Sequence, residues 1–258
     1  MLRKLKKALT AFVSAALCVT VVLGITASAA NSDIWKDTKA LTSLNYNSKY
    51  TNWAEKYSEK EAKNTVFYSK SRTKKLLDKI QKEAIAEKPE YIFGLIDSDS
   101  MLCYVFKGNS FKGVSLMDDE CNVMYLSGNA LTLVSTDKKT KASLKVDDDE
   151  TEDFNNIASE YISKYSAQTA ETFDFDIAEN SKGKLFKFKS SEKIYYYEEF
   201  DTDSYYGNIG FVFTEKGTPI AMYLNGRTFC ISFKTTVDDS EFKIPKGYKA
   251  VDFDDFEY

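Results

Sequence analysis

The stretch that decides the fold is Tyr91–Val146, which reads YIFGLIDSDSMLCYVFKGNSFKGVSLMDDECNVMYLSGNALTLVSTDKKTKASLKV. Apolar runs of five to eight residues recur in it, at 91–97, 101–107, 111–117, 121–126, 130–135 and 141–146. Turn-forming residues such as Gly108-Asn109 and Ser127-Gly128-Asn129 separate these runs. Connections this short leave no room for a crossover helix, so neighbouring strands must be antiparallel. The stretch therefore predicts an antiparallel meander of six strands.

The second half of the chain repeats this pattern. Apolar runs predict strands at 172–178, 184–189, 193–200, 209–214, 219–225 and 227–237. In the last of these, Phe229, Ile231 and Phe233 occupy alternate positions, which places all three on one face of the strand. We therefore expect a sheet with one strongly aromatic face and one solvated face.

Two convincing helices are expected around the first meander. One covers 71–88, where Ser71 can cap the N-terminus and Pro89 ends the helix. The other follows Asp147–Glu150, and its apolar stripe consists of Phe154, Ile157, Ala158, Tyr161, Ile162 and Tyr165. The carboxylates of Asp147–Glu150 suit the positive N-terminal end of that helix, and a calcium site is the alternative.

These elements together predict an α+β fold. About twelve strands exceed what a twisted open sheet usually carries without curling, and two helices cannot cover an apolar face of that width. We therefore expect a strongly curved antiparallel sheet, a half-open barrel of about 11–12 strands, with the helices packed on its concave side. The side chains expected to line the remaining concave surface and bind a ligand are Phe186, Phe188, Phe211, Phe213, Phe229, Ile231 and Phe233. The alternative is that these side chains only pack against the two helices.

Residues 1–29 are typical of a secretory signal peptide. Four basic residues precede an apolar stretch from Ala8 to Ile25, and Ala27-Ser28-Ala29 suits cleavage before Ala30. A retained membrane anchor over the same stretch is the competing interpretation. We expect cleavage, and a soluble product that is secreted or located in the cell envelope. That product is expected to contain a partly helical or extended segment at 30–70 and a single domain at 71–258.

Charge and composition exclude several kinds of function. The whole chain has a net charge of −4, and without residues 1–29 it has 31 basic and 39 acidic residues, a net charge of −8. An acidic protein with only three arginines is a poor candidate for binding nucleic acid. The absence of histidine excludes Ser-His and Cys-His nucleophile pairs and the usual catalytic zinc sites. We therefore expect a protein that is not an enzyme and that uses no metal and no cofactor. An enzyme that uses a pair of carboxylates is the alternative.

Three cysteines, Cys103, Cys121 and Cys230, remain after residue 29, and each lies in an apolar run. Cysteine in such a run usually behaves as a small buried hydrophobic residue. An odd number without C-x-x-C spacing favours this interpretation, and one bridge between Cys103 and Cys121 is the alternative.

Two stretches resemble a known class of exported proteins. Met101–Ala142 is a succession of short strands that ends in a Lys-rich turn, and Phe211–Tyr248 contains a Gly217-Thr218-Pro219 turn followed by Asp239–Tyr248. With the order of signal peptide, helix, meander, helix and meander, residues 70–250 look similar to the LolA/LppX class of lipoprotein-carrier proteins. The resemblance implies an unclosed barrel that is lidded by helices and holds acyl chains in an apolar interior.

Two functions of different kinds follow from these observations. The first is an exported, non-catalytic protein that binds a lipid or other apolar ligand in the curved sheet. The second is a cell-envelope interaction or structural protein without a small-molecule ligand. Exposed tyrosines from Tyr195–Tyr197 and Tyr205-Tyr206 would supply contacts to a cell-envelope component in the second case.

Overall fold

The computed structural model describes Leu9, Leu44 and residues 46–98, 100–117, 120–203 and 207–256 of the 258-residue chain. The predicted signal peptide, apart from Leu9, and the Tyr205-Tyr206 pair lie outside these residues. The helices of more than one turn in the described ranges are α3 (Ser48–Ser58), α4 (Arg72–Ala84) and α5 (Thr151–Thr172). The short 3-10 turns are η1 (Tyr68–Lys70), η2 (Asp148–Glu150), η3 (Asp239–Phe242) and η4 (Phe253–Asp255).

The strands fall into two consecutive groups with one short strand at each end. The first group is β2 (Glu90–Ile96), β3 (Met101–Lys107), β4 (Ser110–Met117), β5 (Glu120–Ser127), β6 (Ala130–Ser135) and β7 (Thr140–Lys145). The second group is β8 (Lys182–Ser190), β9 (Lys193–Asp201), β10 (Asn208–Thr214), β11 (Pro219–Leu224) and β12 (Arg227–Lys234). The end strands are β1 (Asn64–Phe67) and β13 (Lys249–Ala250).

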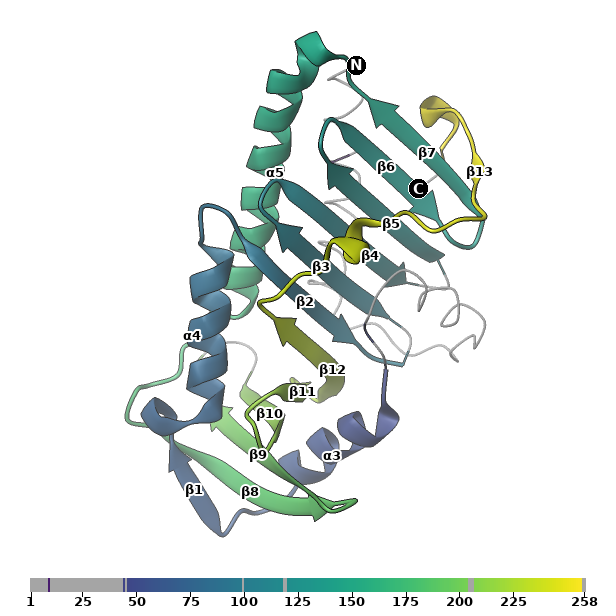
Figure 1. Cartoon of the computed structure of the whole chain (residues 1–258). Coiled ribbons are helices and arrows are strands. Elements are labelled where there is room, and N and C mark those ends of the chain that lie inside the picture. The colour runs from purple at the N-terminus through teal and green to yellow at the C-terminus, as the bar shows by residue number, and fades with distance from the viewer. Residues whose placement is uncertain are drawn as a thin grey trace.

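All of these strands belong to one sheet of 13 strands. Their order is β1-β8-β9-β10-β11-β12-β2-β3-β4-β5-β6-β7-β13, so β12 joins the second meander to the first by pairing with β2 (Figure 1). Neighbouring strands are antiparallel except β7 and β13, which run parallel and make the sheet mixed. Because β1 and β13 lie at opposite ends of this order, the sheet is open.

The six strands of the first meander confirm the predicted runs to within one residue at each end. The turns between them have the backbone geometry that tight hairpins need. Gly108 and Gly128 lie in the left-handed region, with φ of +57° and +61°. In this half of the chain, local turn chemistry was therefore sufficient to place the strands.

The predicted strand at 172–178 is wrong. Helix α5 continues to Thr172, and no described strand includes residues 173–178. Phe173, Phe175 and Ile177 are nevertheless buried in the same apolar cluster as α5. The alternation of apolar and polar residues correctly indicated that one side of an extended segment is buried. Such burial does not require that the segment pairs with a neighbouring strand.

Both faces of the sheet are buried over β2–β6. We call the face that α4 and α5 cover the helix-side face, and the opposite one the far face. The far face of β2–β6 is apolar, with Met101, Cys103, Val105 and Val123 each at most 1% exposed. Leu44, Tyr46, Val237, Phe242 and Tyr248 pack over it, and α3 continues this cover over the second meander beside Val212 and Ala221.

The prediction of a strongly curved antiparallel half-open barrel of 11–12 strands is therefore wrong. The chain forms an open, mixed sheet of 13 strands that is not strongly curled. The sequence predicts a curled sheet only if one face carries an excess of apolar side chains and the opposite face is exposed to solvent. In the structure the sheet is instead a middle layer between two covers, so the apolar residues are buried without closing the sheet.

Two predicted helices are confirmed, with different ends. Ser71 caps α4 by accepting a hydrogen bond from the Lys74 backbone N–H, and α4 ends at Ala84 rather than at residue 88. The acidic residues before α5 lie in and around η2, and none of the side chains there caps α5. The segment before residue 70 also joins this architecture, because α3 packs on β9–β12 and β1 pairs with β8.

The cysteines behave as the apolar runs indicated. Cys103, Cys121 and Cys230 are buried on the far face, and no disulfide joins them to one another. The Cys230 Sγ accepts a hydrogen bond of 3.2 Å from the Asn47 backbone N–H, just before α3. Burial raises the pKa of the Cys230 thiol, which keeps it protonated at neutral pH.

Candidate functional site

The helix-side face of β2–β7 is graded from large apolar to polar side chains. Strand pairing aligns its residues in three rows that run across the strands. The first row contains Tyr91, Phe106, Phe111, Leu126, Leu131 and Leu144. The second row contains Phe93, Tyr104, Gly113, Met124, Leu133 and Ala142. The third row contains Leu95, Leu102, Ser115, Asn122, Ser135 and Thr140.

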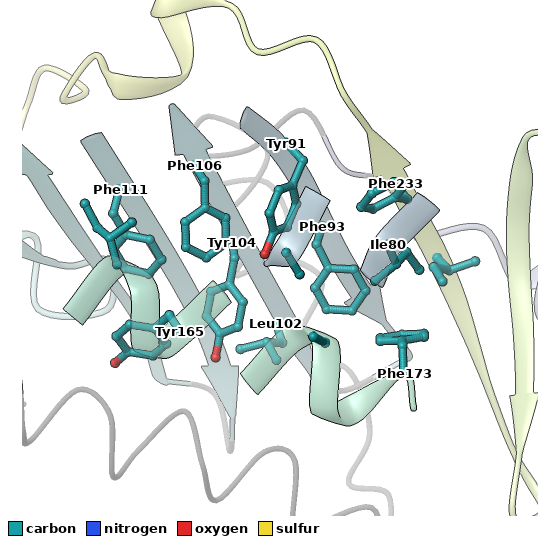
Figure 2. Close-up of a cluster of buried hydrophobic side chains, with 14 of the residues drawn as sticks. Ile80, Tyr91, Phe93, Leu102, Tyr104, Phe106, Phe111, Tyr165, Phe173 and Phe233 are labelled. Carbon is teal, nitrogen blue, oxygen red and sulfur yellow. The ribbon is translucent and has the colours of Figure 1, made fainter. Parts of the chain in front are cut away.

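Helix α5 lies against the first row. Tyr165 stacks on Phe111 with ring centroids 4.9 Å apart and an angle of 15° between the rings, and it lies 5.4 Å from Tyr104 in the second row. Figure 2 shows these rings with Phe106 and Tyr91 beneath α5, and the hydroxyl ends of Tyr104 and Tyr165 point away from Phe106. Where the helix leaves the sheet, Phe173 contacts Phe93 with centroids 5.1 Å apart.

The second and third rows become smaller and more polar toward β7. In the second row, Gly113 and Ala142 contribute little side-chain volume, and both are buried. Ser115 and Ser135 are buried in the third row, and the Ser135 hydroxyl donates a 2.7 Å hydrogen bond to Asp137. The Asn122 Oδ1 is buried without a hydrogen-bond partner among the described residues. This part of the helix-side face is therefore an apolar surface with polar side chains along one edge.

The buried hydroxyls of Tyr91 and Tyr165, both on the helix side of the sheet, differ in their hydrogen bonding. The Tyr91 and Ser166 hydroxyls lie 3.0 Å apart, and the Ser166 hydroxyl also donates to the Ala84 carbonyl at the end of α4. The Tyr165 hydroxyl is buried and has no hydrogen-bond partner within the described ranges. Burial raises the pKa of Tyr165, so its hydroxyl stays protonated and can donate. An unsatisfied buried donor of this kind requires an explanation, and a bound polar group is one.

Helix α4 is fastened to the sheet by a buried carboxylate. Glu198 of β9, whose side chain is fully buried, accepts hydrogen bonds from the backbone N–H groups of Arg72 and Thr73, at 2.8 and 2.9 Å. The Thr73 hydroxyl and the Arg72 guanidinium each add a contact of 3.1 Å. The guanidinium also lies over the Tyr196 ring, 3.7 Å from its centroid. Because a negative charge at a helix N-terminus is favourable, this cluster sets where α4 begins.

A second buried carboxylate lies on the far face. Glu199 accepts a hydrogen bond from the Tyr197 hydroxyl, forms an ion pair of 2.7 Å with Lys184 and accepts a 3.3 Å bond from Asn208. Burial, followed by the charge of Glu199, raises the pKa of Tyr197, so the phenol remains a proton donor. With every partner engaged, this cluster is suited to holding strands β8–β10 together and not to acid–base chemistry.

The seven predicted ligand-lining residues do not share one surface. Phe211, Phe213, Phe229, Ile231 and Phe233 belong to the helix-side cluster. Phe186 and Phe188 lie on the far face, where Tyr57 of α3 contacts them with centroids 5.0 and 4.5 Å apart. The structure brings the first five together with the core under α4 and α5, and it separates the other two from them.

The sequence pattern did not predict the residues of the graded face as ligand contacts. Tyr104 and Tyr165 lie in different elements, and only the register of β3–β7 places Gly113 and Ala142 in one row with Tyr104. A usable signal was present in the sequence. Along 113–124 and 133–142 the positions of one face carry Gly, Ser, Asn and Ala among apolar residues, which is unusual for a fully packed core.

The described residues contain no group of three or more acidic or cysteine side chains that could hold a metal ion. This includes the Asp147–Glu150 segment considered for calcium. Within the same ranges, no helix is long and apolar enough to cross a membrane.

Comparison with known proteins does not assign this chain to a family. No family model matches it, and no curated protein matches it. Among solved structures, the chain is similar to an uncharacterized conserved protein from Thermus thermophilus, with 9% identity over 70% of this chain and 99% of that chain. The TM-score of 0.30 is too low to support an argument about fold or function. The resemblance to the LolA/LppX class therefore stays a prediction.

Proposed function

We propose that the chain is an exported, non-catalytic binding protein that holds a lipid or other apolar ligand with one polar end. The ligand would lie on the helix-side face of β3–β7, beside α5. The observation that carries the proposal is the grading of that face, from the aromatic first row to the polar third row. An amphiphile matches such a surface, because its apolar chain and its polar end are then satisfied at the same time.

The dimensions of the second row suit an extended chain. The five strands β3–β7 place four strand spacings between Tyr104 and Ala142, or about 19 Å at roughly 4.8 Å each. A ligand tail that removes about 300 Å² of apolar surface from water would gain about 7 kcal/mol before association costs. That magnitude is sufficient for binding of an acyl chain without any covalent or metal chemistry.

The polar groups beside this row support the same interpretation. The Tyr165 hydroxyl and the Asn122 amide oxygen are both buried without partners among the described residues. One is a donor and the other an acceptor, so together they could satisfy a carboxyl, ester or hydroxyl group. Tyr165 lies on α5 with its ring centroid 5.4 Å from that of Tyr104 in the second row, and Asn122 lies on β5 in the third row.

The test is binding of palmitate by the processed chain, residues 30–258, together with native mass spectrometry after exposure to a lipid extract. Ala142→Phe places a large ring in the second row, and we expect it to weaken palmitate binding at least tenfold (~1.4 kcal/mol). Lys145→Phe is the matched control, because Lys145 is exposed on the same strand. Equal affinity for palmitate in both variants, or the absence of bound lipid in every preparation, would contradict the proposal.

The alternative function, an interaction or structural protein of the cell envelope, has one specific observation in its favour. Trp53, Tyr57, Phe186 and Phe188 form a half-buried aromatic group where α3 meets β8. The tyrosines first considered for this role do not join it as exposed groups, since Tyr195 and Tyr197 are buried. A pull-down from cell-wall fractions with Trp53→Ala as the comparison tests this alternative.

A further inference from the structure

Helix α4 and strand β8 are basic, although the chain as a whole is acidic. Together they contain nine basic and two acidic residues, whereas residues 30–258 outside these two elements contain 22 basic and 37 acidic residues. On α4, Lys75, Lys79 and Lys82 are exposed, and their spacing of four and three residues places them on one face of the helix. None of the three forms an ion pair with a described residue.

Tyr196 of β9 joins this face of α4 to β8. The Arg72 Cζ lies 3.7 Å from the centroid of the Tyr196 ring, and the Lys187 Nζ lies 5.8 Å from the same centroid. Lys187 pairs in register with Tyr196, is exposed, and forms no ion pair with a described residue. The lysines of α4 and β8 therefore belong to one surface on the helix side of the sheet. We call it the α4–β8 basic surface, and its exposed charges without an ion pair among the described residues are Lys75, Lys79, Lys82 and Lys187.

The acidic residues of the chain do not cancel this local charge. Asp147–Glu150 follows β7, and β7 lies ten strand spacings from β8 in the sheet, or about 48 Å along it at roughly 4.8 Å each (Figure 1). The Debye length at physiological ionic strength is only about 8 Å, so exposed charges at that distance are screened. A partner that contacts α4 and β8 therefore meets a positive surface, whatever the net charge of the chain.

An exposed apolar side chain lies at the end of this surface. Ile85 follows directly after α4 and is 73% exposed, more than the other exposed large apolar side chains in the described ranges. It comes three residues after Lys82, so the two side chains are neighbours on the helix surface. Lysines beside an exposed apolar side chain match a bilayer interface, where ammonium groups contact anionic headgroups and the apolar group enters the acyl boundary. A soluble polyanion would use the lysines but would offer no apolar contact to Ile85.

We propose that the α4–β8 basic surface docks the protein on a membrane that contains anionic phospholipids, with Ile85 inserted among the lipids. Each lysine close to an anionic leaflet raises the affinity about fivefold, so four of them suffice for reversible binding without a membrane-spanning segment. The inference does not depend on the proposed lipid ligand, because a protein with an empty or filled ligand site would dock in the same way.

The experiment uses the full chain with a fluorescent label at the proposed contact. Ala86→Cys, next to Ile85, is labelled with nitrobenzoxadiazole on a Cys18→Ser background, while Cys103, Cys121 and Cys230 are buried. The labelled protein is titrated with vesicles of phosphatidylcholine that contain about one third phosphatidylglycerol, and with vesicles of phosphatidylcholine alone. A label at Lys246→Cys is the matched control, because Lys246 is exposed in the segment that leads to β13 at the opposite end of the sheet.

Two sets of substitutions then test which side chains make the contact. Lys75→Glu with Lys187→Glu reverses one charge on each element of the surface, and Lys145→Glu with Lys243→Glu makes the same change at exposed positions elsewhere. Ile85→Ser removes the apolar group and keeps the charges. Circular dichroism and thermal unfolding of each variant establish that the fold is retained, as expected for exposed positions.

We expect the label at residue 86 to shift to shorter wavelength with the anionic vesicles but not with the neutral ones, and the label at residue 246 to stay unchanged. The Lys75/Lys187 pair should raise the lipid concentration at half-maximal response at least tenfold, and Ile85→Ser about threefold, while the Lys145/Lys243 pair should change it less than about twofold. Equal responses at residues 86 and 246, or an equal response to neutral vesicles, would place the contact elsewhere and overturn the inference. Retention of the protein by soluble polyphosphate without any label shift on vesicles would identify a soluble polyanion as the partner and would also overturn it.

Discussion

Glu198 offers the sharpest test of how α4 is held over the sheet. Its side chain is fully buried, and its two oxygens accept from two backbone N–H groups, one hydroxyl and one guanidinium. Glu198→Gln keeps the size of the side chain but removes the negative charge. The amide then presents N–H donors to the Arg72 guanidinium, or to the backbone donors at the start of α4, where an acceptor is needed.

The expected cost follows from these contacts. A hydrogen bond to a charged group contributes about 1.5–3 kcal/mol, and Glu198→Gln replaces one such bond by a donor facing a donor. The loss of charge at the helix N-terminus adds about 0.3–1 kcal/mol. We therefore expect a decrease of about 2–4 kcal/mol in the free energy of unfolding, or a decrease in Tm of about 4–16 °C for a chain of this size.

Urea unfolding followed by circular dichroism measures this change, with an unchanged m-value as the check that both states are the same. Asp78→Asn is the matched control, because Asp78 forms a 2.9 Å ion pair with Lys74 on the same helix but is 61% exposed. The control should cost about 0.5 kcal/mol or less. A loss below about 1 kcal/mol in Glu198→Gln would refute the reasoning that this carboxylate anchors α4.

Three further predictions concern burial. Burial raises the pKa of Tyr91 to about 12, so above pH 10 the phenol loses its proton more readily in the unfolded chain than in the folded one. The free energy of unfolding therefore falls as pH rises from 10 to 12, by up to about 2.7 kcal/mol. Tyr91→Phe should reduce this pH dependence in urea unfolding measured at pH 8 and pH 11. In the processed chain, thiol titration should be slow under native conditions and should reach three thiols per chain in urea, whereas two fewer would reveal a bridge. Gly183→Ala should destabilise the protein more than Gly94→Ala, because an added Cβ meets the Glu199 backbone carbonyl in the first case and the flexible end of the Leu44 side chain in the second; equal losses in thermal unfolding would contradict this.

Local elements were readable from the sequence because their signals are local. Gly108 and Gly128 mark hairpin turns, and Ser71 marks the start of α4, whatever the rest of the chain does. The burial of Phe173, Phe175 and Ile177 was also readable, although their segment is not a strand. In each case a few neighbouring residues contain the whole physical cause.

The assumption of a solvated face failed although the sequence contained evidence against it. Met101–Phe106 is apolar at every position, as expected for a strand that is buried on both faces and not for one that is half exposed. What would cover the second face could not be read locally, because Leu44 and Val237 are far from β3 in the sequence. The seven predicted lining residues were divided between two faces for the same reason, since strand alternation fixes a face only within one strand.

By itself, the sequence determined strands β2–β12, most of their ends, the two main helices and the burial of the cysteines, but not the short end strands β1 and β13. Tertiary structure alone decided that the sheet is an open middle layer, and that Tyr104, Gly113, Met124, Leu133 and Ala142 form one row beside Tyr165. The physical reason is the range of the interactions. Turns, caps and alternation depend on neighbours in the chain, whereas strand register and the cover of each face depend on contacts between residues that are tens to hundreds of positions apart.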